Sequence, residues 1–589
     1  MRLLALCLGL LGLAATVDAI AAPMTTQTLS FTASDGVKLR AYLSSAGAPT
    51  ARPLIVEFSP YAPSSFSAQF AGPAAFGRDF GPAYNYLEVN ARGTGQSGGV
   101  WSAIGPRDQQ DVAEVLAWAC AQPWSNGHIG LYGFSASAIA IYNSMHLKLS
   151  CVDAASLMAG SEDLYRDLLY PGGIFNFVPA TVVAFGVGLP LLASEPANAR
   201  DESLYAALQT GIGLLGLDAN VLAHTTEDSY WQARTETPGP NTFPVLIDTS
   251  FYDPEPRGPF QSFRYLQSIG VTTHLITFGA HDGYPAGTLG PFPEFQRWYD
   301  RYLLGTANGV ELEPAVQLLL GDGSREALNA GNYTRVEGGT WPLPGTRWQP
   351  LYLDPTHSGT ALSLNDGSLS AAPARAGLQA YVDVPSLASA TDPHTTSTAA
   401  LVGAGPLSFN SLFDAVPLLT EMNAATAVSL TYTSPPLQAP VDLVGPAALD
   451  IFLATATPVD DIYAVLADFG PDHVANAVGV GRLRTGFPNI DRSRSLIDTN
   501  GEVVQPYGIY SAETPALPLA TREYHVEFWP VGNHFAAGHR LRLYLVGPSA
   551  FMLGVPGVNL VSLGGAHPSR LLLPVLAGSD LHRAIGATH

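Results

Sequence analysis

Two patterns of apolar residues divide this chain of 589 residues near position 310. Before that position, apolar runs of strand length alternate with helical segments, as in residues 53–58, 84–90 and 108–120. Such alternation is typical of a mostly parallel sheet with helices packed on its faces. Beyond position 310, short alternating strands are separated by Gly, Pro, Asn and Asp, which is typical of a β-sandwich. The sequence therefore predicts an α/β core followed by an all-β domain.

Residues 133–137 carry the clearest chemical signal of the first part. They read Gly-Phe-Ser-Ala-Ser and stand between an apolar run at 128–132 and a second one at 138–142. This is the pattern of a strand, a tight turn between small residues and a helix. A serine at the apex of such a turn is exposed, and the N–H of the next residue can point at a developing oxyanion. We therefore expect Ser135 to be a nucleophile and Ala136 to supply an oxyanion donor.

A nucleophilic serine needs a histidine base and an acid that orients the histidine. In an α/β-hydrolase sheet the acid and the histidine follow later strands, in that order along the chain. Asp253 follows the predicted strand 245–248, and His281 lies in a glycine-flanked loop after the predicted strand 274–278. We expect Asp253 and His281 to complete a triad with Ser135. Asp248, at the end of its strand, and Asp282, beside the histidine, are the alternatives for the acid.

The second oxyanion donor is expected after the first core strand. That strand ends at Ser59-Pro60-Tyr61. The phenolic O–H of Tyr61 is suited to a developing negative charge, and the alternative is an aromatic side chain packed in a loop.

The predicted domains follow from these patterns and from a break in the strand–helix rhythm. Residues 173–193 carry no charged side chain, but their prolines and glycines favour a pocket-lining cap over a membrane span. An apolar stretch after Arg2 and the sequence Ala19-Ile20-Ala21 indicate a signal peptide, with a competing cleavage pattern at 17–19. The expected units are a signal peptide (1–21), the first part of the core (22–160), a helical cap (161–240), the second part of the core (241–310) and a C-terminal β-sandwich with its linker (311–589).

Charge and cysteine content limit the partners and the compartment. The formal net charge is −21, from 49 acidic and 28 basic residues, which argues against nucleic acid as a partner. No residue cluster indicates a metal site, and no cofactor is expected. We expect a secreted or periplasmic protein with no membrane span in the mature chain. Cys120 and Cys151 would be its only cysteines; they could pair in an oxidising compartment, but the sequence does not give their separation.

Several segments together resemble the cocaine-esterase-like group of α/β-hydrolases, which includes X-prolyl dipeptidyl-peptidases and α-amino-acid ester hydrolases. The resemblance runs along nearly the whole mature chain. It is carried by residues 59–61, 90–99, 124–130, 228–234, 251–253, 297–305 and 538–543, together with His281. It implies a hydrolase core, a helical cap and a C-terminal jelly roll, with the triad named above, Tyr61 as oxyanion donor and no cofactor.

One departure from this family concerns the nucleophile turn. The family motif usually reads Gly-x-Ser-Tyr-x-Gly, whereas this chain has Ala136 and Ala138 at the last two defined positions. Loss of the tyrosine leaves the backbone donor intact and removes an aromatic wall beside the nucleophile. The departure therefore bears on substrate preference and not on the reaction.

The expected activity is hydrolysis of acyl esters of small molecules, because the cap is strongly apolar. The alternative is a substrate with a free amine, such as a short peptide cleaved by an X-prolyl dipeptidyl-peptidase or an α-amino-acid ester. That activity needs a carboxylate for the ammonium, and Asp167 and Glu255 are the candidates; otherwise they are surface groups or partners of an arginine. A further alternative is a secreted carbohydrate-binding protein without catalysis.

Overall fold

The computed structural model describes most of the residues of the chain. They are residues 23–60, 80–176, 219–237, 239–252, 255–278, 291–324, 327–328, 330–361, 365–383, 422, 426, 429–547 and 557–587. The expected signal peptide, Tyr61, Asp253, His281 and Asp282 lie outside them.

A ten-stranded sheet forms the first domain, in the order β1-β2-β4-β3-β5-β6-β7-β8-β9-β10. The strands from β3 to β9 run parallel to their neighbours, while β1, β2 and β10 pair antiparallel at the two edges. The strands are β1 (Met24–Thr32), β2 (Lys38–Ala46), β3 (Arg52–Ser59), β4 (Asn85–Asn90), β5 (Ser125–Phe134), β6 (Val152–Met158), β7 (Val245–Thr249), β8 (Thr273–Thr277), β9 (Val316–Leu320) and β10 (Thr334–Gly338).

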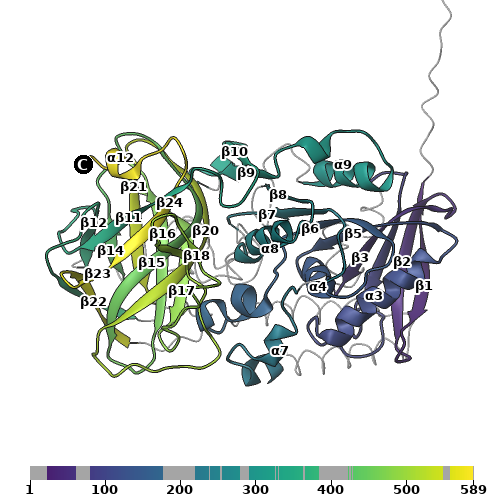
Figure 1. Ribbon diagram of the computed structural model, residues 1–589, viewed down its shortest axis with the longest axis horizontal. Coiled ribbons are helices and arrows are strands. Elements are labelled where there is room, and N and C mark those ends of the chain that lie inside the picture. The colour runs from purple at the N-terminus through teal and green to yellow at the C-terminus, as the bar shows by residue number, and fades with distance from the viewer. Residues whose placement is uncertain are drawn as a thin grey trace, which may run out of the picture.

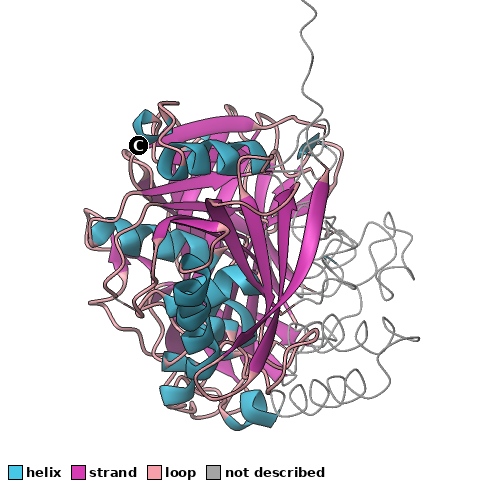
Figure 2. Cartoon of the chain, turned by 90° about the vertical axis from the view of Figure 1, so that its right-hand side faces the viewer, coloured by secondary structure: helices cyan, strands magenta, loops and turns pink. Residues whose placement is uncertain are grey.

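Helices cover both faces of this sheet, because successive side chains of a buried strand point to opposite sides. Leu54 and Val56 of β3 share a cluster with the apolar residues of α3 (Pro106–Cys120), α4 (Ala136–Ser144) and α8 (Arg257–Ser268). Ile55, between them, belongs to a second cluster with α9 (Phe292–Leu303). Figure 2 shows helices lying beside the magenta strands of the sheet.

The strands and helices predicted from apolar patterning in the first part are present, but the core sheet extends further than expected. Val316 of β9 pairs with Leu275 of β8, and β10 then pairs with β9. The expected boundary at residue 310 is therefore wrong for the sheet, which ends at Gly338. The misplacement has a simple cause: β9 is a short apolar strand in a region of short strands, and its pattern does not tell which sheet it joins.

Only short helical segments of the expected cap are described. A π-helical turn η1 (Leu164–Leu169) and a 3₁₀ turn η2 (Pro171–Gly173) follow β6, and α7 (Ser229–Gln232) precedes β7. Residues 177–218 lie outside the described part. Within the described part, no helix combines the length and apolar character needed to cross a bilayer.

The C-terminal part of the chain forms a twelve-stranded sheet, which occupies the left half of Figure 1. Its path closes on itself, because β24 pairs both with β11 and with β15. The strands that follow the core sheet are β11 (Arg347–Asp354), β12 (Asp366–Ser370), β13 (Leu378–Asp383), β14 (Leu430–Thr433), β15 (Val441–Thr455), β16 (Asp461–Phe469), β17 (Ala475–Arg484), β20 (Arg522–Phe535), β21 (Arg540–Val546), β22 (Gly557–Gly564), β23 (His567–Pro568) and β24 (Arg570–Val575), with the separate pair β18 (Leu496–Ile497) and β19 (Val503–Gln505); helix α12 (Leu581–Ala584) follows.

A disulfide joins Cys120, at the end of α3, to Cys151, just before β6. The sequence leaves this pairing open because it does not give the distance, and in the structure the two Cα atoms are 6.1 Å apart. The bond links two elements on either side of the β5–α4 unit, which carries Ser135. It therefore closes a loop of 31 residues around the central part of the core.

Replacing both cysteines by serine is expected to destabilise the core. Closing a loop of this length lowers the entropy of the unfolded chain, which corresponds to about 3–4 kcal/mol of stability. Urea denaturation of the oxidised protein and of the C120S/C151S variant measures the difference. Equal midpoints and slopes would show that the bond contributes nothing to folding.

Candidate active site

Ser135 occupies a strained turn between β5 and α4. Its backbone φ is 52° and its ψ is −121°, and it is the N-cap residue of α4. A positive φ is rare for a residue with a side chain, and it is the conformation that lifts a serine out of a strand–turn–helix corner. The Ser135 N–H donates to the carbonyl oxygen of Met158 at 2.9 Å, and the Ser135 carbonyl accepts from the N–H of Ile139 at 3.0 Å. The turn predicted from the sequence is therefore present.

Small residues allow α4 to pass close to the sheet at this turn. A Cβ atom on Gly133 would lie 2.5 Å from the backbone nitrogen of Ala138, which is too close for any side chain. On the other side, a Cβ on Gly160 would lie 2.7 Å from the Ala138 Cβ. Gly160 thus leaves room for the methyl group of Ala138, at the position where the resembled family carries glycine. This accounts for the tolerance of that substitution.

The strands that precede the other expected site residues end at the same edge of the sheet. β3 lies next to β5 on one side, and β6, β7 and β8 follow on the other, all parallel. The carboxyl ends of parallel strands meet at one edge, where open α/β sheets bind their ligands. Tyr61, Asp253 and His281 follow β3, β7 and β8, but they lie outside the described residues, so their side chains are not placed here.

The alternative acid Asp248 is described. It is a buried residue inside β7, and its backbone carbonyl accepts the N–H of Ala159 at 2.9 Å. Asp253 comes after the end of this strand, where the chain leaves the sheet and a side chain can approach the catalytic edge. The position of Asp248 within the strand therefore favours Asp253 as the acid, in line with the sequence-based preference.

The residue directly before Asp253 is fixed by the strand domain. The buried hydroxyl of Tyr252 donates to the carbonyl oxygen of Gly532 in β20 at 2.7 Å and accepts the N–H of Gly321 at 3.0 Å. Phe251 packs so closely on Gly532 that a Cβ on this glycine would lie 2.2 Å from the ring. The segment directly before Asp253 is thus held by contacts from two other parts of the chain.

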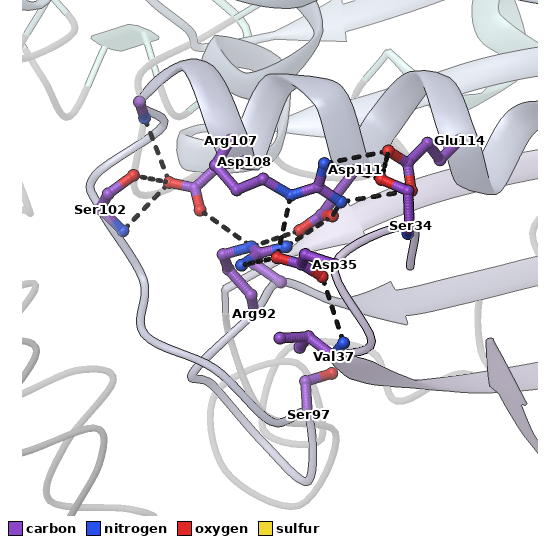
Figure 3. Close-up of polar contacts among 12 residues, drawn as sticks. Ser34, Asp35, Val37, Arg92, Ser97, Ser102, Arg107, Asp108, Asp111 and Glu114 are labelled. Carbon is purple, nitrogen blue, oxygen red and sulfur yellow. Dashed lines mark hydrogen bonds and ion pairs between the residues drawn. The ribbon is translucent and has the colours of Figure 1, made fainter. Parts of the chain in front are cut away.

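An arginine network holds the loop that follows β4 at the carboxyl edge of the core sheet (Figure 3). The guanidinium of Arg92 donates to both carboxylate oxygens of Asp111 in α3, at 2.6 and 2.8 Å, and to Asp35 at 3.0 Å. Arg107 binds Asp111 from the other side at 2.7 Å. Asp108 completes the cluster by accepting the N–H of Gly105 at the start of α3. A buried bidentate pair of this kind fixes the orientation of the loop as well as its position.

Asp167, a candidate for binding a substrate amine, already has a cationic partner. It is fully buried, and its Oδ1 accepts from Nη1 of Arg257 at 2.9 Å while its Oδ2 accepts from the Ser161 hydroxyl at 2.8 Å. Burial raises the pKa of Asp167 to about 6, with Arg257 and Ser161 acting in the opposite direction. The geometry therefore favours the interpretation of Asp167 as an arginine partner.

Arg257 extends this contact to the strand domain, because its Nε donates to Glu527 of β20 at 2.9 Å. Glu255, the other amine-binding candidate, is also buried and lies two residues before this arginine. Glu255 therefore lies in the β7–α8 connection, next to the arginine that binds Asp167. Within the described part of the chain, no group of three or more His, Cys, Asp or Glu side chains is arranged to hold a metal ion.

Three residues of this region were not singled out by the sequence. Tyr252 and Arg257 act through partners about 270 to 280 positions away, which no local pattern reveals. The third is Glu57, a buried carboxyl inside β3. The sequence does contain a signal for this residue, since a glutamate interrupts the apolar run Pro-Leu-Ile-Val-Glu-Phe. Charged residues are rarely fully buried without a partner or a function.

Comparison with known families gives two matches that together span most of the chain. Residues 35–282 match the X-Pro dipeptidyl-peptidase (S15 family) domain. Residues 308–571 match the C-terminal non-catalytic domain of X-Pro dipeptidyl-peptidases.

Individual relatives agree with these matches. Cocaine esterase from Rhodococcus sp. is 23% identical over 531 residues, which cover 80% of this chain and 84% of that protein. A CocE/NonD family hydrolase from Staphylococcus aureus has a similar fold, with a TM-score of 0.70, 18% identity and 94% of each chain covered. The structure of an α-amino acid ester hydrolase is similar with a TM-score of 0.71 and 16% identity, covering 94% of this chain and 97% of that one.

Replacing Gly133 by alanine is expected to disrupt the turn, because the new methyl group would overlap the backbone of α4. We expect a loss of about 1–3 kcal/mol of stability and a clear fall in kcat. The matched control is Gly339→Ala, since a Cβ at Gly339 meets nothing within 4 Å. Urea denaturation and ester turnover of both variants test this, and equal behaviour of the two would contradict the close-packing argument.

Replacing Tyr252 by phenylalanine is expected to leave a buried carbonyl and a buried N–H without their partner. We expect a loss of about 1–3 kcal/mol of stability and a lower kcat with little change in KM. Tyr432→Phe is the control: among the described residues this fully buried tyrosine has a hydroxyl without a hydrogen bond. Denaturation midpoints and kinetics of both variants are the measurements. A Tyr252 variant that matches its control would show that the hydroxyl does not support the loop of the expected acid Asp253.

Proposed function

Since this chain belongs to the X-Pro dipeptidyl-peptidase (S15) family of serine hydrolases, we propose that it hydrolyses carboxylic acyl esters through an acyl-enzyme intermediate on Ser135. The observation that carries the proposal is the conformation of Ser135. This residue has a positive φ and lies at the start of α4, at the carboxyl edge of the sheet. This conformation costs energy, and such strain persists where it exposes a nucleophile.

The proposed reaction has two balanced halves. Ser135 Oγ attacks the ester carbonyl carbon while His281 takes the serine proton, and collapse of the tetrahedral intermediate breaks the C–O bond to the alcohol. The alcohol leaves with the proton from His281. Water then attacks the acyl group with the same proton transfers, which releases the acid and restores Ser135. Asp253 orients His281 and stabilises its charged form.

Two donors are proposed for the oxyanion. The Ala136 N–H belongs to the first turn of α4, whose dipole also favours negative charge at that end. The Tyr61 hydroxyl is the proposed second donor, two residues after β3 ends at Ser59. Since β3 and β5 are neighbours in the sheet, both donors belong to adjacent strand ends.

The proposed substrates are esters without a free amine. The Asp167–Arg257 ion pair supports this choice, because a carboxylate that already binds a guanidinium is a poor site for a second cation. The absence of charged side chains from residues 173–193 supports an apolar acyl or aromatic group as well. Cleavage of X-prolyl peptides or of α-amino-acid esters is the competing proposal, and Glu255 is the residue that would serve it.

We also propose that the protein is exported and that its strand domain is a jelly roll that supports the core. The Cys120–Cys151 disulfide supports an oxidising compartment, in agreement with the expected signal peptide. The contacts of Tyr252 and Arg257 with β20 support a structural role for the strand domain.

Replacing Ser135 by alanine tests the proposed function. Hydrolysis of p-nitrophenyl acyl esters should fall by at least about a thousandfold, because the nucleophile acts as a unit with its base. Covalent labelling by a fluorophosphonate should disappear in the variant, while far-UV circular dichroism should remain unchanged. Absence of fluorophosphonate labelling in the wild-type protein would contradict the proposal.

Substrate class is tested by comparing these esters with Xaa-Pro-nitroanilides under the same conditions. We expect the esters to have the higher kcat/KM. Faster turnover of the prolyl anilide would overturn the choice of ester and favour the peptidase.

A further inference from the structure

Two glutamates lie side by side in the core sheet behind the nucleophile turn. β3 and β4 run parallel, and their register places Glu57 opposite Glu88. Both side chains are buried, with 6% and 1% of their surface exposed. Neither forms an ion pair with any arginine, lysine or histidine of the described residues. A pair of acids in such a place is costly to bury and calls for an explanation.

Glu57 contacts the helix that carries the proposed oxyanion donor. Its Oε1 accepts a hydrogen bond from the Ser137 hydroxyl at 3.0 Å, and its Oε2 accepts one from the Tyr86 hydroxyl. Ser137 is the second residue of α4 and directly follows Ala136. Glu57 itself precedes the end of β3 by two residues. One hydrogen bond therefore ties the end of β3, which leads to Tyr61, to the helical turn that presents the Ala136 N–H.

We propose that Glu57 is a positioning residue of the oxyanion hole: through Ser137 it holds the first turn of α4 against the end of β3, and its charge acts on the oxyanion. The inference rests on the proposed function, because it assigns a role toward the oxyanion of that same reaction.

The groups that face Glu57 determine when it carries a charge. They are the hydroxyls of Tyr86 and Ser137, the carboxyl of Glu88 beside them, and the phenol of Tyr299 from α9. Burial raises the pKa of Glu57 to about 7, although both hydroxyl donors act to lower it. Burial raises the pKa of Glu88 well above its ordinary value, and the nearby Glu57 adds to this effect. Two hydroxyl donors stabilise the charged form of Glu57, whereas the buried carboxylate oxygens of Glu88 have no hydrogen-bond partner among the described residues, so Glu57 is the member of the pair that ionises as the pH rises through about 7.

The sign of the effect on catalysis follows from the position of Glu57. Below neutral pH its carboxyl is uncharged and still hydrogen-bonded, so it holds Ser137 without opposing the reaction. Above neutral pH it is an anion behind the turn where negative charge develops on the substrate. Like charges in a water-poor environment repel strongly, so the transition state becomes less stable. Turnover should thus fall as the pH rises through about 7.

The test is the pH dependence of kcat for a p-nitrophenyl acyl ester, together with the rate of fluorophosphonate labelling. For the wild type we expect a fall of about tenfold on the alkaline side of the optimum. In the Glu57→Gln variant the fall should disappear while the acid-side activity is kept, because glutamine accepts the Ser137 hydrogen bond without ionising. An alkaline fall of unchanged size in this variant would overturn the proposal.

Glu236→Gln is the matched control. Glu236 is another buried acid whose pKa is raised, to about 8, but it lies before β7 and outside the turn. This variant should keep the wild-type pH profile. If both glutamine variants changed the profile alike, the effect would reflect buried charge in general and the proposal would fail.

Ser137→Ala separates the hydrogen bond from the charge and keeps the test decisive if the Glu57 variant does not fold. This variant removes the hydrogen bond between Ser137 and Glu57 and leaves the Glu57 carboxyl in place. We expect a lower kcat across the pH range at nearly unchanged KM, with the alkaline fall preserved. Wild-type kcat in this variant would refute the positioning role. Failure of the proposed function is distinguishable, since the wild type would then show neither ester turnover nor labelling.

Discussion

Helix α4 passes strand β5 so closely that no side chain fits between them at Gly133, and the rest of the site depends on this approach. The chain can turn from strand to helix in this space only if the intervening residue takes an unusual backbone conformation, and Ser135 takes it with a φ of 52°. The hydrogen bond from its N–H to Met158 then fixes the turn to β6. One packing constraint thus determines the position of the proposed nucleophile, the direction of the helix dipole and the access from the carboxyl edge.

The strand domain contributes to this arrangement although its family description is non-catalytic. In its strand β20, the carbonyl oxygen of Gly532 accepts a hydrogen bond from the Tyr252 hydroxyl, and Glu527 binds Arg257. Both partners flank the segment that contains Asp253. An acid on a loop needs support from outside the loop, because orientation of the histidine tolerates little displacement. Strand β20 of the second domain supplies such contacts on both sides of the proposed acid, so the core alone does not contain all the contacts that fix its own loops.

The accuracy of the sequence-based predictions depended on how far apart the interacting residues are. The Ser135 turn was predictable because strand, turn and helix are contiguous. The assignment of β9 to the core sheet was not, because its pairing with β8 spans a helix and leaves no local trace. The Asp167–Arg257 pair joins residues 90 positions apart, so the sequence could only present an arginine partner as one alternative. Tyr61, Asp253 and His281 remain predictions from spacing and resemblance.

Buried acids without a cationic partner give the core an unusual electrostatic character. Asp167 is compensated by Arg257, whereas Glu57 is surrounded by hydroxyls and by a second carboxyl. A group whose pKa is raised on folding binds its proton more tightly in the native state. Its contribution to stability is therefore complete below its ordinary pKa and is lost as the pH rises through the raised value, here from about 4.5 to about 7 for Glu57. Retaining such a group beside the nucleophile lowers stability at neutral pH. A leucine would avoid that cost but could not accept the Ser137 hydrogen bond, so a hydrogen-bonding side chain at this position is best explained by its contact with the first turn of α4.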